Sequence, residues 1–491
     1  MDCLPQNKLR VSGKKLFLLP SIIVVCVIIA DFFLQGGWKV CEEAVIRTAA
    51  GDLLFAGTRE GRQALVGSIW WAPLPTMLLF MLKHIPFIGT GHLPSFLLST
   101  FSFVLVLVLL ETYLQRISWG KIWRFLLITA LVLNDCFLKA VSSGSFGTMS
   151  ACAVLLFAAS MIKWSADFRL RYLVYTALSG ACLLMLQFEL GLWAFAGLVL
   201  LCADLAHRTL RSNQKEAIII LLIIPFLYVA LLWVLLNWLI MGNPLYFVQT
   251  IRLIFSPQNS ETCAGEQWLI IFWAIPSIVL FFVGIAKRQR HNFYLGVITM
   301  LMCIEMLFFS AKGMGFVVER TLPSIILLSA FCSASIHGFS KPNTPVRYYC
   351  LAILLFVIIS WITAYKMPRN CIFEEKNPSI ETIRACAKKA GRHVKIFVAG
   401  YKGLMLIPPA KCEREFVYTF DFDVYQVARE YPGQILYLLV HEPVGIAKFE
   451  SLYVKYPNIY FMGASGIIYD SQWGNWRLFK IAGAMPPFRL K

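Results

Sequence analysis

A small group of ionisable residues in this chain could carry out group transfer at a membrane. Glu42 and Glu43 are adjacent in the stretch VCEEAV, shortly after the first long apolar run. A carboxylate can act as a general base that takes a proton from an acceptor hydroxyl. Lys312 and Arg320, in AKGMGFVVERTLP, are cations that can neutralise a phosphate. A base and cations on one wet face suit an anionic lipid-borne substrate that loses a phosphate.

Structural explanations are available for the same residues. Glu42 and Glu43 open a stretch, residues 41–56, that has helical spacing. Acidic side chains there would simply stabilise the positive end of the helix dipole. Arg320 begins a predicted span, so its side chain could merely extend to lipid headgroups. At the level of the sequence these alternatives stay open.

Further charged residues lie at or within the predicted spans. Glu189, in LQFELG, lies between two spans and is either a substrate-binding group or a plain interfacial carboxylate. Asp135 and Lys139 are one helical turn apart, which favours a pair that neutralises itself. Glu305 lies deeper in its span, and we assign it no role. Ionisable groups at membrane depth are costly and usually face a bundle interior or a wet cavity.

The composition places these residues in a membrane protein. Of the 491 residues, 58% are hydrophobic and only 15% are charged, which is more apolar surface than a soluble fold of this size can bury. We predict a polytopic α-helical membrane protein whose helices contact membrane lipids. The net charge of +18 would also suit nucleic-acid binding, but Lys and Arg collect in the cytoplasmic loops of membrane proteins. We therefore expect no nucleic-acid partner.

Apolar runs long enough to cross a bilayer recur along most of the chain. The first run follows a basic stub and has no small-residue cleavage site after it, so we expect a retained span rather than a signal peptide. About eleven transmembrane helices are predicted, at 16–34, 95–114, 125–141, 147–162, 172–187, 190–206, 216–240, 268–286, 292–310, 319–336 and 348–366.

The distribution of Lys and Arg orients these spans. The connections predicted to be cytoplasmic contain eighteen Lys and Arg residues, whereas the short outer connections contain only Arg252 and Lys312, with Arg320 at the outer start of a span. Because positively charged loops stay inside, we expect a cytoplasmic N-terminus, an outer C-terminus and a bacterial-type inner (plasma) membrane. The predicted cytoplasmic connections are 1–15, 115–124, 163–171, 207–215, 287–291 and 337–347.

One apolar segment does not fit this orientation as a crossing. Residues 69–82, IWWAPLPTMLLFML, are only 14 in number and include Pro73 and Pro75. If this segment crossed the membrane, every later loop would exchange sides, against the charge distribution. We predict a re-entrant or interfacial helix on the outer side, within an outer loop at 35–94.

The composition changes near residue 367, where ordinary charge density and alternating short helix and strand patterns begin. We predict a membrane domain at 1–366 and a small outer α/β domain at 367–491. No GxGxxG or GxxxxGK stretch occurs in it, so we expect no nucleotide site. The predicted elements are strands at 394–400, 435–440 and 458–463, and helices at 377–390 and 446–456.

Neither a metal nor another cofactor is predicted. The outer segments contain an odd number of cysteines and the chain has no CxxC, so no zinc site or disulfide framework is indicated. Cys386 and Cys412 are one candidate disulfide. The only DxD triplet, Asp421-Phe422-Asp423, lies in the C-terminal domain rather than in the first outer loop.

Several short motifs stand in a recognisable order along the chain. Trp38, Glu42-Glu43-Ala44 and Ala72-Pro73-Leu74-Pro75 follow the first span. The later motifs are FELG (188–191), NWLIMGNPLYF (237–247), ERTLP (319–323) and GNWRLFK (474–480). The order of these motifs, and the side of the membrane on which each is predicted to lie, resemble those of the GT-C superfamily of lipid-dependent glycosyltransferases. The resemblance extends over nearly the whole chain. The resemblance is to the branch of protein O-mannosyltransferases and lipid A aminoarabinose transferases.

The resemblance implies a GT-C-like fold and an inverting transfer of a sugar from a polyprenyl-phosphate donor. The acceptor would be a lipid, glycan or protein, and no obligatory metal is implied. We assign catalysis to Glu42 or Glu43. We assign substrate binding to Glu189, Lys312 and Arg320.

The chain departs from the family pattern at two places. Glu42 stands where Asp is usual, and the extra methylene would set the acceptor back by about an ångström, a displacement that can slow an enzyme. Thr148, in SSGSFGTMSA, stands near a position where the family often has Asp. An inactive protein that has kept the fold is therefore one alternative. A transporter or lipid flippase is another, although such proteins often have internal repeats with matched broken helices, and we find none in the sequence.

Overall fold

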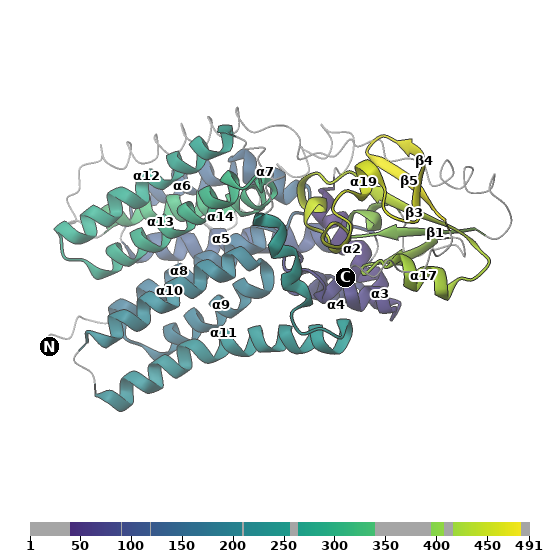
Figure 1. Ribbon diagram of the computed structural model, residues 1–491. Helices are drawn as coiled ribbons and strands as arrows, with labels where there is room; N and C mark the ends of the chain where they lie inside the picture. Colours follow the sequence, from purple (N-terminus) through teal and green to yellow (C-terminus); the bar gives the residue numbers. More distant parts are fainter. Residues whose placement is uncertain are drawn as a thin grey trace.

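The computed structural model describes residues 40–89, 91–117, 119–208, 211–255, 264–338, 394–406 and 416–482. Within these ranges a long helical bundle has a mixed β-sheet packed against one end (Figure 1). Some predictions fall outside the described residues: the spans 16–34 and 348–366, the domain boundary near 366, the helix 377–390 and the Cys386–Cys412 disulfide.

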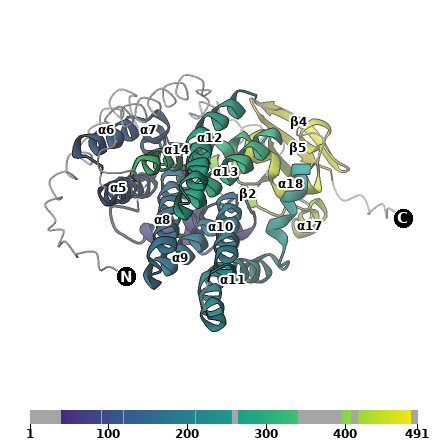
Figure 2. The same cartoon turned by 90° about the vertical axis from the view of Figure 1, so that its left-hand side faces the viewer.

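Seven helices in the described part of the chain are long and apolar enough to cross a membrane, and each overlaps a predicted span. Seen from the far end of the bundle (Figure 2), α11 lies at its margin. Only 17% of the apolar 18-residue stretch of α11 is buried, so its side chains are suited to face lipid. The seven are α5 (Leu93–Arg116), α8 (Gly147–Asp167), α10 (Phe188–Ala206), α11 (Ser212–Met241), α12 (Ala264–Ala286), α13 (Arg290–Ala311) and α14 (Gly315–Gly338).

The span predicted at 125–141 is not one straight helix. It forms α6 (Lys121–Val132) and α7 (Asp135–Ser142), which meet at a bend of 58°. The Asn134 side chain accepts a hydrogen bond from the Cys136 N–H (3.1 Å) and so caps α7 at the break. Taken as one broken span, the pair makes an eighth candidate crossing.

The span predicted at 172–187 is also different in length. It forms α9 (Leu170–Leu186), whose 17 residues make it shorter than the seven long helices. The described residues therefore contain seven or eight candidate crossings, fewer than the nine predicted spans that fall within them.

The outer loop predicted at 35–94 contains three short helices, which lie between the bundle and the sheet (Figure 1). They are α2 (Glu42–Phe55), α3 (Arg59–Val66) and α4 (Pro73–Lys83). The segment 69–82 contributes to α4, which has 11 residues and is too short to cross a bilayer. Proline fits its first position because that residue has no intrahelical partner for an N–H.

The C-terminal domain contains a five-stranded sheet in the order β2-β1-β3-β5-β4. β1 pairs in parallel with β2 and β3, while β5 runs antiparallel to β3 and β4. The strands predicted at 394–400 and 435–440 are confirmed as β1 and β3. The strand bounds are β1 (Val394–Ala399), β2 (Phe416–Thr419), β3 (Ile435–His441), β4 (Ile467–Trp473) and β5 (Trp476–Ile481).

The strand predicted at 458–463 is wrong, because this segment forms the short helix α19 (Ile459–Met462). Ile459 and Tyr460 are buried, whereas the next two side chains, Phe461 and Met462, are exposed. Two adjacent buried residues followed by two exposed ones fit a helical turn and not the alternation of a strand. The helix predicted at 446–456 is divided into a 3₁₀ helix, η6 (Gly445–Phe449), and α18 (Ser451–Lys455). A further helix, α17 (Val424–Glu430), follows β2.

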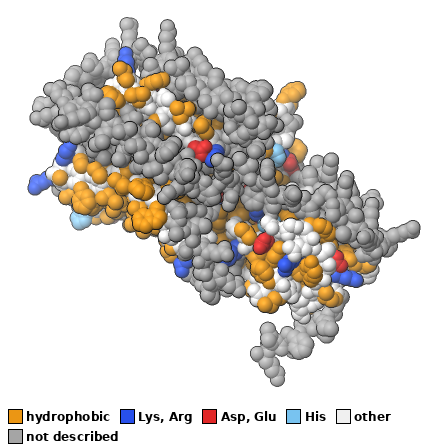
Figure 3. Space-filling view, turned by 90° about the horizontal axis from the view of Figure 1, so that it is seen from above, with side chains coloured by type: hydrophobic (Ala, Val, Ile, Leu, Met, Phe, Trp, Pro, Cys, Tyr) orange, Lys and Arg blue, Asp and Glu red, His pale blue; other side chains and the backbone are white. Residues whose placement is uncertain are grey.

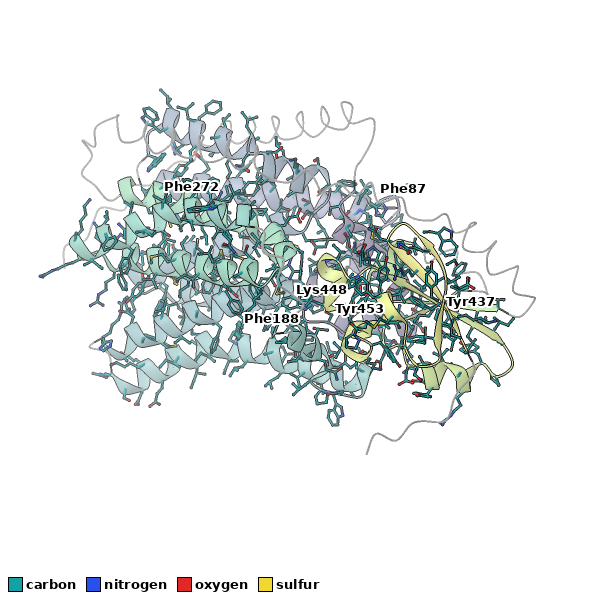
Figure 4. The ribbon with its side chains drawn as sticks, turned by 45° about the horizontal axis from the view of Figure 1, so that its top comes forward. Phe87, Phe188, Phe272, Tyr437, Lys448 and Tyr453 are labelled. Atoms are coloured by element: carbon teal, nitrogen blue, oxygen red, sulfur yellow. The ribbon has the colours of Figure 1, made fainter. Side chains whose placement is uncertain are left out.

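The bundle and the C-terminal domain share one hydrophobic core at their junction. The Trp70 ring lies 6.4 Å from Phe188 of α10, 5.9 Å from Phe316 of α14 and 5.7 Å from Phe449 of η6. Figure 4 shows Phe188 and Lys448 near this boundary. The short helices α2 to α4 and the loop that carries Trp70 therefore form the contact layer between the two parts.

Candidate active site

A cavity of about 200 Å³ lies where α2, α7 and α14 meet the C-terminal domain. Three of the five predicted site residues line it: Glu42, Glu43 and Arg320. The domain contributes Ile446. The other lining residues are Cys41, Trp71, Cys136, Lys139, Ala140, Ser143, Ser145, Phe316, Glu319, Leu322 and Pro323.

The two carboxylates occupy the first turn of α2. Cys41 is the N-cap, and its backbone N–H donates to the Ser143 carbonyl (3.0 Å), which ties the start of α2 to the end of α7. The side chains of Glu42 and Glu43 are each 16% exposed, so they are largely buried yet reach the cavity. Burial, and then the charge of Glu43, raise the pKa of the Cys41 thiol to about 12, so this thiol stays protonated at neutral pH.

Arg47, one turn further along α2, holds Glu43 in place. Its Nε donates to Glu43 Oε1 (2.8 Å), and its Nη1 donates to the Ala72 carbonyl (2.9 Å) and Thr76 Oγ1 (3.3 Å). The guanidinium also lies 5.1 Å from the centre of the Trp71 ring. Burial lowers the pKa of Arg47, and the charge of Glu43 opposes this shift. Arg47 therefore fixes one carboxylate and links α2 to α4.

Arg320 is held by two residues from other parts of the chain. Its Nε and Nη2 donate to the two carboxylate oxygens of Glu189 (2.6 and 2.8 Å), and its Nη1 donates to the Trp70 carbonyl (2.8 Å). Two parallel bonds to a carboxylate fix the plane of a guanidinium. Glu189 is fully buried in the first turn of α10, so in the structure it orients Arg320 and does not itself line the cavity.

A third ion pair brings the C-terminal domain to the site. Lys402 follows β1, in a short 3₁₀ helix, η4 (Lys402–Met405). Its Nζ lies 2.5 Å from Glu42 Oε1, and its backbone N–H donates to Glu450 Oε1 (3.1 Å). Each carboxylate at the start of α2 therefore has its own buried cation.

The remaining charged residues lie at the edge of the site or away from it. Asp135 and Lys139 form the predicted pair, with 2.6 Å between Lys139 Nζ and Asp135 Oδ2, and Lys139 lines the cavity. Lys312, a predicted substrate-binding residue, is the C-cap of α13 and does not line the cavity. Glu305 lies within α13 and is likewise not a lining residue.

The DxD triplet of the C-terminal domain makes structural contacts. Asp423 caps α17 by accepting the backbone N–H groups of Tyr425 (2.9 Å) and Gln426 (3.1 Å). Asp421 accepts a hydrogen bond from the Tyr246 hydroxyl (3.1 Å) and pairs with Lys455. Among the residues that the structure describes, no group of three or more His, Cys, Asp or Glu side chains is placed to hold a metal.

Sequence reasoning missed Arg47 and Lys402. Arg47 follows Glu43 by four positions on a predicted helix, a spacing at which side chains of opposite charge meet. That signal was present in the sequence. Lys402 lies just beyond a predicted strand in a different domain, and no local pattern connects it with Glu42.

Comparison with solved structures identifies the fold. ArnT from Cupriavidus metallidurans bound to undecaprenyl phosphate matches with a TM-score of 0.53 and 11% identity, over 96% of this chain and 100% of that one. The apo state of the same ArnT matches with a TM-score of 0.50 and 11% identity, over 94% and 99% of the two chains. The mycobacterial arabinofuranosyltransferase AftD matches with a TM-score of 0.50 and 14% identity, over 96% of this chain and 42% of that one.

The sequence matches no protein-family model and no curated protein. The likeness to the solved structures therefore lies in the fold, and it covers the bundle as well as the C-terminal domain. This agrees with the family that the sequence motifs indicate. The chain shares the overall fold of ArnT and AftD.

Proposed function

We propose that this protein is a membrane glycosyltransferase that moves a sugar from a polyprenyl-phosphate donor to an acceptor on the outer face of the membrane. The observation that carries the proposal is the cavity in which Glu42, Glu43 and the anchored Arg320 lie together. The fold supports it, because the ArnT structure with this fold holds undecaprenyl phosphate.

The proposed reaction is a single displacement with inversion at the sugar carbon. The carboxylate of Glu42 or Glu43 takes the proton of the acceptor hydroxyl. The hydroxyl oxygen forms a bond to the anomeric carbon while the bond from that carbon to the phosphate oxygen breaks, and its electron pair stays on the phosphate. Lys402 and Arg47 contact the two carboxylates at their Oε1 atoms. Both glutamate side chains line the cavity, where an acceptor hydroxyl would be within their reach.

Arg320 is the group that we propose meets the leaving phosphate. Glu189 and Trp70 accept bonds from three of its five N–H groups. This places the guanidinium in the cavity wall before the donor arrives, so no reorganisation is needed as charge develops on the phosphate. The donor tail would lie between the apolar helices. Lys312 would act only as an outlying cation.

The cavity is proposed to open on the outer side of the inner (plasma) membrane. The connections between α10 and α11 and between α12 and α13, which are rich in Lys and Arg, lie at the end of the bundle away from the sheet (Figure 1). Viewed from above (Figure 3), blue Lys and Arg side chains project at that same left-hand end. Reporter fusions after Lys215 and Lys287 should report the cytoplasm, and a fusion after Lys491 the outside. A cytoplasmic C-terminus would contradict this orientation.

Activity can be tested with the purified full chain in proteoliposomes. The donors would be radiolabelled undecaprenyl phosphates carrying mannose, arabinose or aminoarabinose, and the acceptors would be envelope extract from a strain lacking the protein. Transfer of label to the extract, together with loss of one sugar from that strain's glycans by mass spectrometry, is the expected result. Movement of the intact lipid-linked sugar across the bilayer, without a new glycosidic bond, would instead indicate a flippase.

A further inference from the structure

The C-terminal domain reaches the proposed base through a buried lysine. Lys402 is 3% exposed, and its Nζ lies 2.5 Å from Glu42 Oε1. Lys402 is not among the residues that line the cavity, whereas Glu42 is. The Glu42 carboxylate therefore connects this lysine with a substrate in the cavity.

The loop that presents Lys402 has a specific backbone shape. Gly400 lies in the left-handed region, with φ of +80°, and a Cβ at this position would overlap the Glu450 carboxylate. Glu450 accepts the Lys402 backbone N–H (3.1 Å), and the Tyr418 hydroxyl donates to the Gly400 carbonyl. The direction of the lysine is thus set by groups within the C-terminal domain.

The same loop is fixed to the membrane part of the protein. The Tyr401 ring stacks on Trp71, with 4.9 Å between centres and 15° between planes, and the Tyr401 hydroxyl donates to the Ala64 carbonyl (3.0 Å). Trp71 lines the cavity. From one loop, Tyr401 and Lys402 therefore contact two different residues that line the cavity, Trp71 and Glu42.

Lys402 lies close to two carboxyl groups, those of Glu42 and Glu450. Glu43 already has Arg47 as its partner. Burial raises the pKa of Glu450 to about 8, and the backbone N–H and the charge of Lys402 oppose this shift. Glu42 is largely buried and adjacent to Glu43, and a cation at its Oε1 favours the ionised form of a carboxyl in such surroundings.

We infer that Lys402 is a positioning residue which keeps Glu42 ionised and directed into the cavity, so that the C-terminal domain completes the active site. This inference rests on the proposed function and assigns the role of base to Glu42 rather than Glu43. The lysine is held in register by Tyr401 and Glu450. Loss of the contact between Lys402 and Glu42 would leave the cavity lining in place. The Glu42 carboxyl would then be partly protonated and would no longer point into the cavity.

Several titratable groups surround Glu42 and contribute to its behaviour with pH. Removal of the lysine charge takes away a cation 2.5 Å from Glu42 Oε1, so the carboxyl should protonate at a higher pH. The acidic limb of the turnover profile should then move upward, by about one pH unit or more. The surrounding groups are Cys41, Glu43 and Arg47 of α2, Lys139 of α7, Glu319 and Arg320 of α14, Tyr401 and Lys402 beside β1, and Glu450.

The test compares Lys402→Met, Lys402→Arg and the control Lys455→Met in the full-length protein in proteoliposomes. Lys455 belongs to the same domain and pairs with Asp421, away from the cavity lining. With undecaprenyl-phosphate sugars as donors, we expect Lys402→Met to lower kcat about 10- to 100-fold with donor KM little changed. We expect Lys402→Arg to recover much of the loss. Only Lys402→Met should shift the acidic limb upward.

A second measurement does not depend on transfer. Infrared difference spectra of protein labelled with ¹³C-carboxyl glutamate, wild type minus Glu42→Gln, report the protonation of Glu42 directly. Lys402→Met should move this titration to higher pH, and Lys455→Met should leave it in place. An unmoved titration, or equal losses of activity in Lys402→Met and Lys455→Met, would overturn the inference. If the wild type transfers no sugar but the titration of Glu42 still shifts in Lys402→Met, the proposed function would be overturned. The interaction between Lys402 and Glu42 would still be supported.

Discussion

Buried ion pairs occur at both ends of the helical bundle, and those next to the sheet adjoin the cavity that contains Glu42 and Glu43. Away from the sheet, Arg124 of α6 lies 2.5 Å from Glu111 of α5. Next to the sheet, Arg320 lies 2.6 Å from Glu189, with comparable burial. Two buried arginine–glutamate ion pairs therefore have different surroundings. The Arg320 pair faces a cavity that also contains carboxylates, whereas the Arg124 pair does not line that cavity.

A second pair at the end away from the sheet has similar surroundings. Arg208 lies 2.5 Å from Asp204 and 4.1 Å from the centre of the Phe168 ring, and Arg290 approaches Asp204 at 3.5 Å. These contacts neutralise a carboxylate where helices end. A buried ion pair is thus not by itself evidence of catalysis, and the Arg320 pair differs from these pairs in adjoining the cavity that Glu42 and Glu43 line.

Among substitutions that compare the two ends of the bundle, those at the start of α2 are expected to have the largest effect on transfer. Glu42→Gln or Glu43→Gln preserves the shape of the side chain and removes its basicity. If the inference about Lys402 is right, Glu42→Gln should lower transfer about 10²–10⁴-fold, and Glu43→Gln should have the smaller effect. Initial rates in proteoliposomes, normalised to folded protein, provide the measurement.

The control for these variants is Glu111→Gln, at the other end of the bundle. Removing one member of a buried pair destabilises a protein by about 3–5 kcal/mol, so this variant should unfold at lower temperature. Its rate per folded molecule should remain close to that of wild type. Nearly normal transfer by both α2 variants and by the double variant would remove these carboxylates from the mechanism.

The next largest effect is expected for Arg320→Lys. Lysine keeps the charge but cannot reproduce the two parallel hydrogen bonds to Glu189. We expect kcat to fall about 10- to 100-fold, with undecaprenyl phosphate binding weakened less, because the charge on the phosphate grows as its bond breaks. Arg124→Lys is the matched control. Wild-type turnover by Arg320→Lys would show that this arginine serves only the fold.

The sequence was informative about which residues approach this end of the bundle. The charge bias placed Glu42, Glu189 and Arg320 on one predicted side, and the structure brings Glu189 and Arg320 into contact. Their direct pairing could not be predicted, because it depends on how α10 packs beside α14. Hydrophobic periodicity gives the length of a span but not its neighbours.

Two other differences have local physical causes. The bend between α6 and α7 follows from a cap at Asn134, inside a run that is apolar enough to be predicted as one span. The segment 458–463 has the aromatic and β-branched composition of a strand, yet it buries two adjacent residues as a helical turn does. In both cases the local structure depends on a few polar or exposed residues, and the average composition of the segment does not reveal it.

A smaller effect is expected for Arg47→Lys. The guanidinium bonds to Glu43, the Ala72 carbonyl and Thr76 at once. A lysine ammonium could neutralise Glu43 but could not span the gap to α4 with the same geometry. We expect a loss of about tenfold in turnover and a lower unfolding temperature in detergent. If both the turnover and the unfolding temperature stay at their wild-type values, packing alone would hold Glu43 and α4 in place.

The smallest effect is expected for Lys139→Met, although Lys139 lines the same cavity. Its side chain is 40% exposed and that of its partner Asp135 is 34% exposed, whereas Arg320 is almost fully buried. Exposed pairs of this kind contribute only about 0.3–0.5 kcal/mol, and water can screen the charge from a phosphate. Turnover should therefore fall less than about threefold. A loss as large as that of Arg320→Lys would show that the phosphate lies nearer to α7 than to α14, and would move the centre of the proposed site across the cavity.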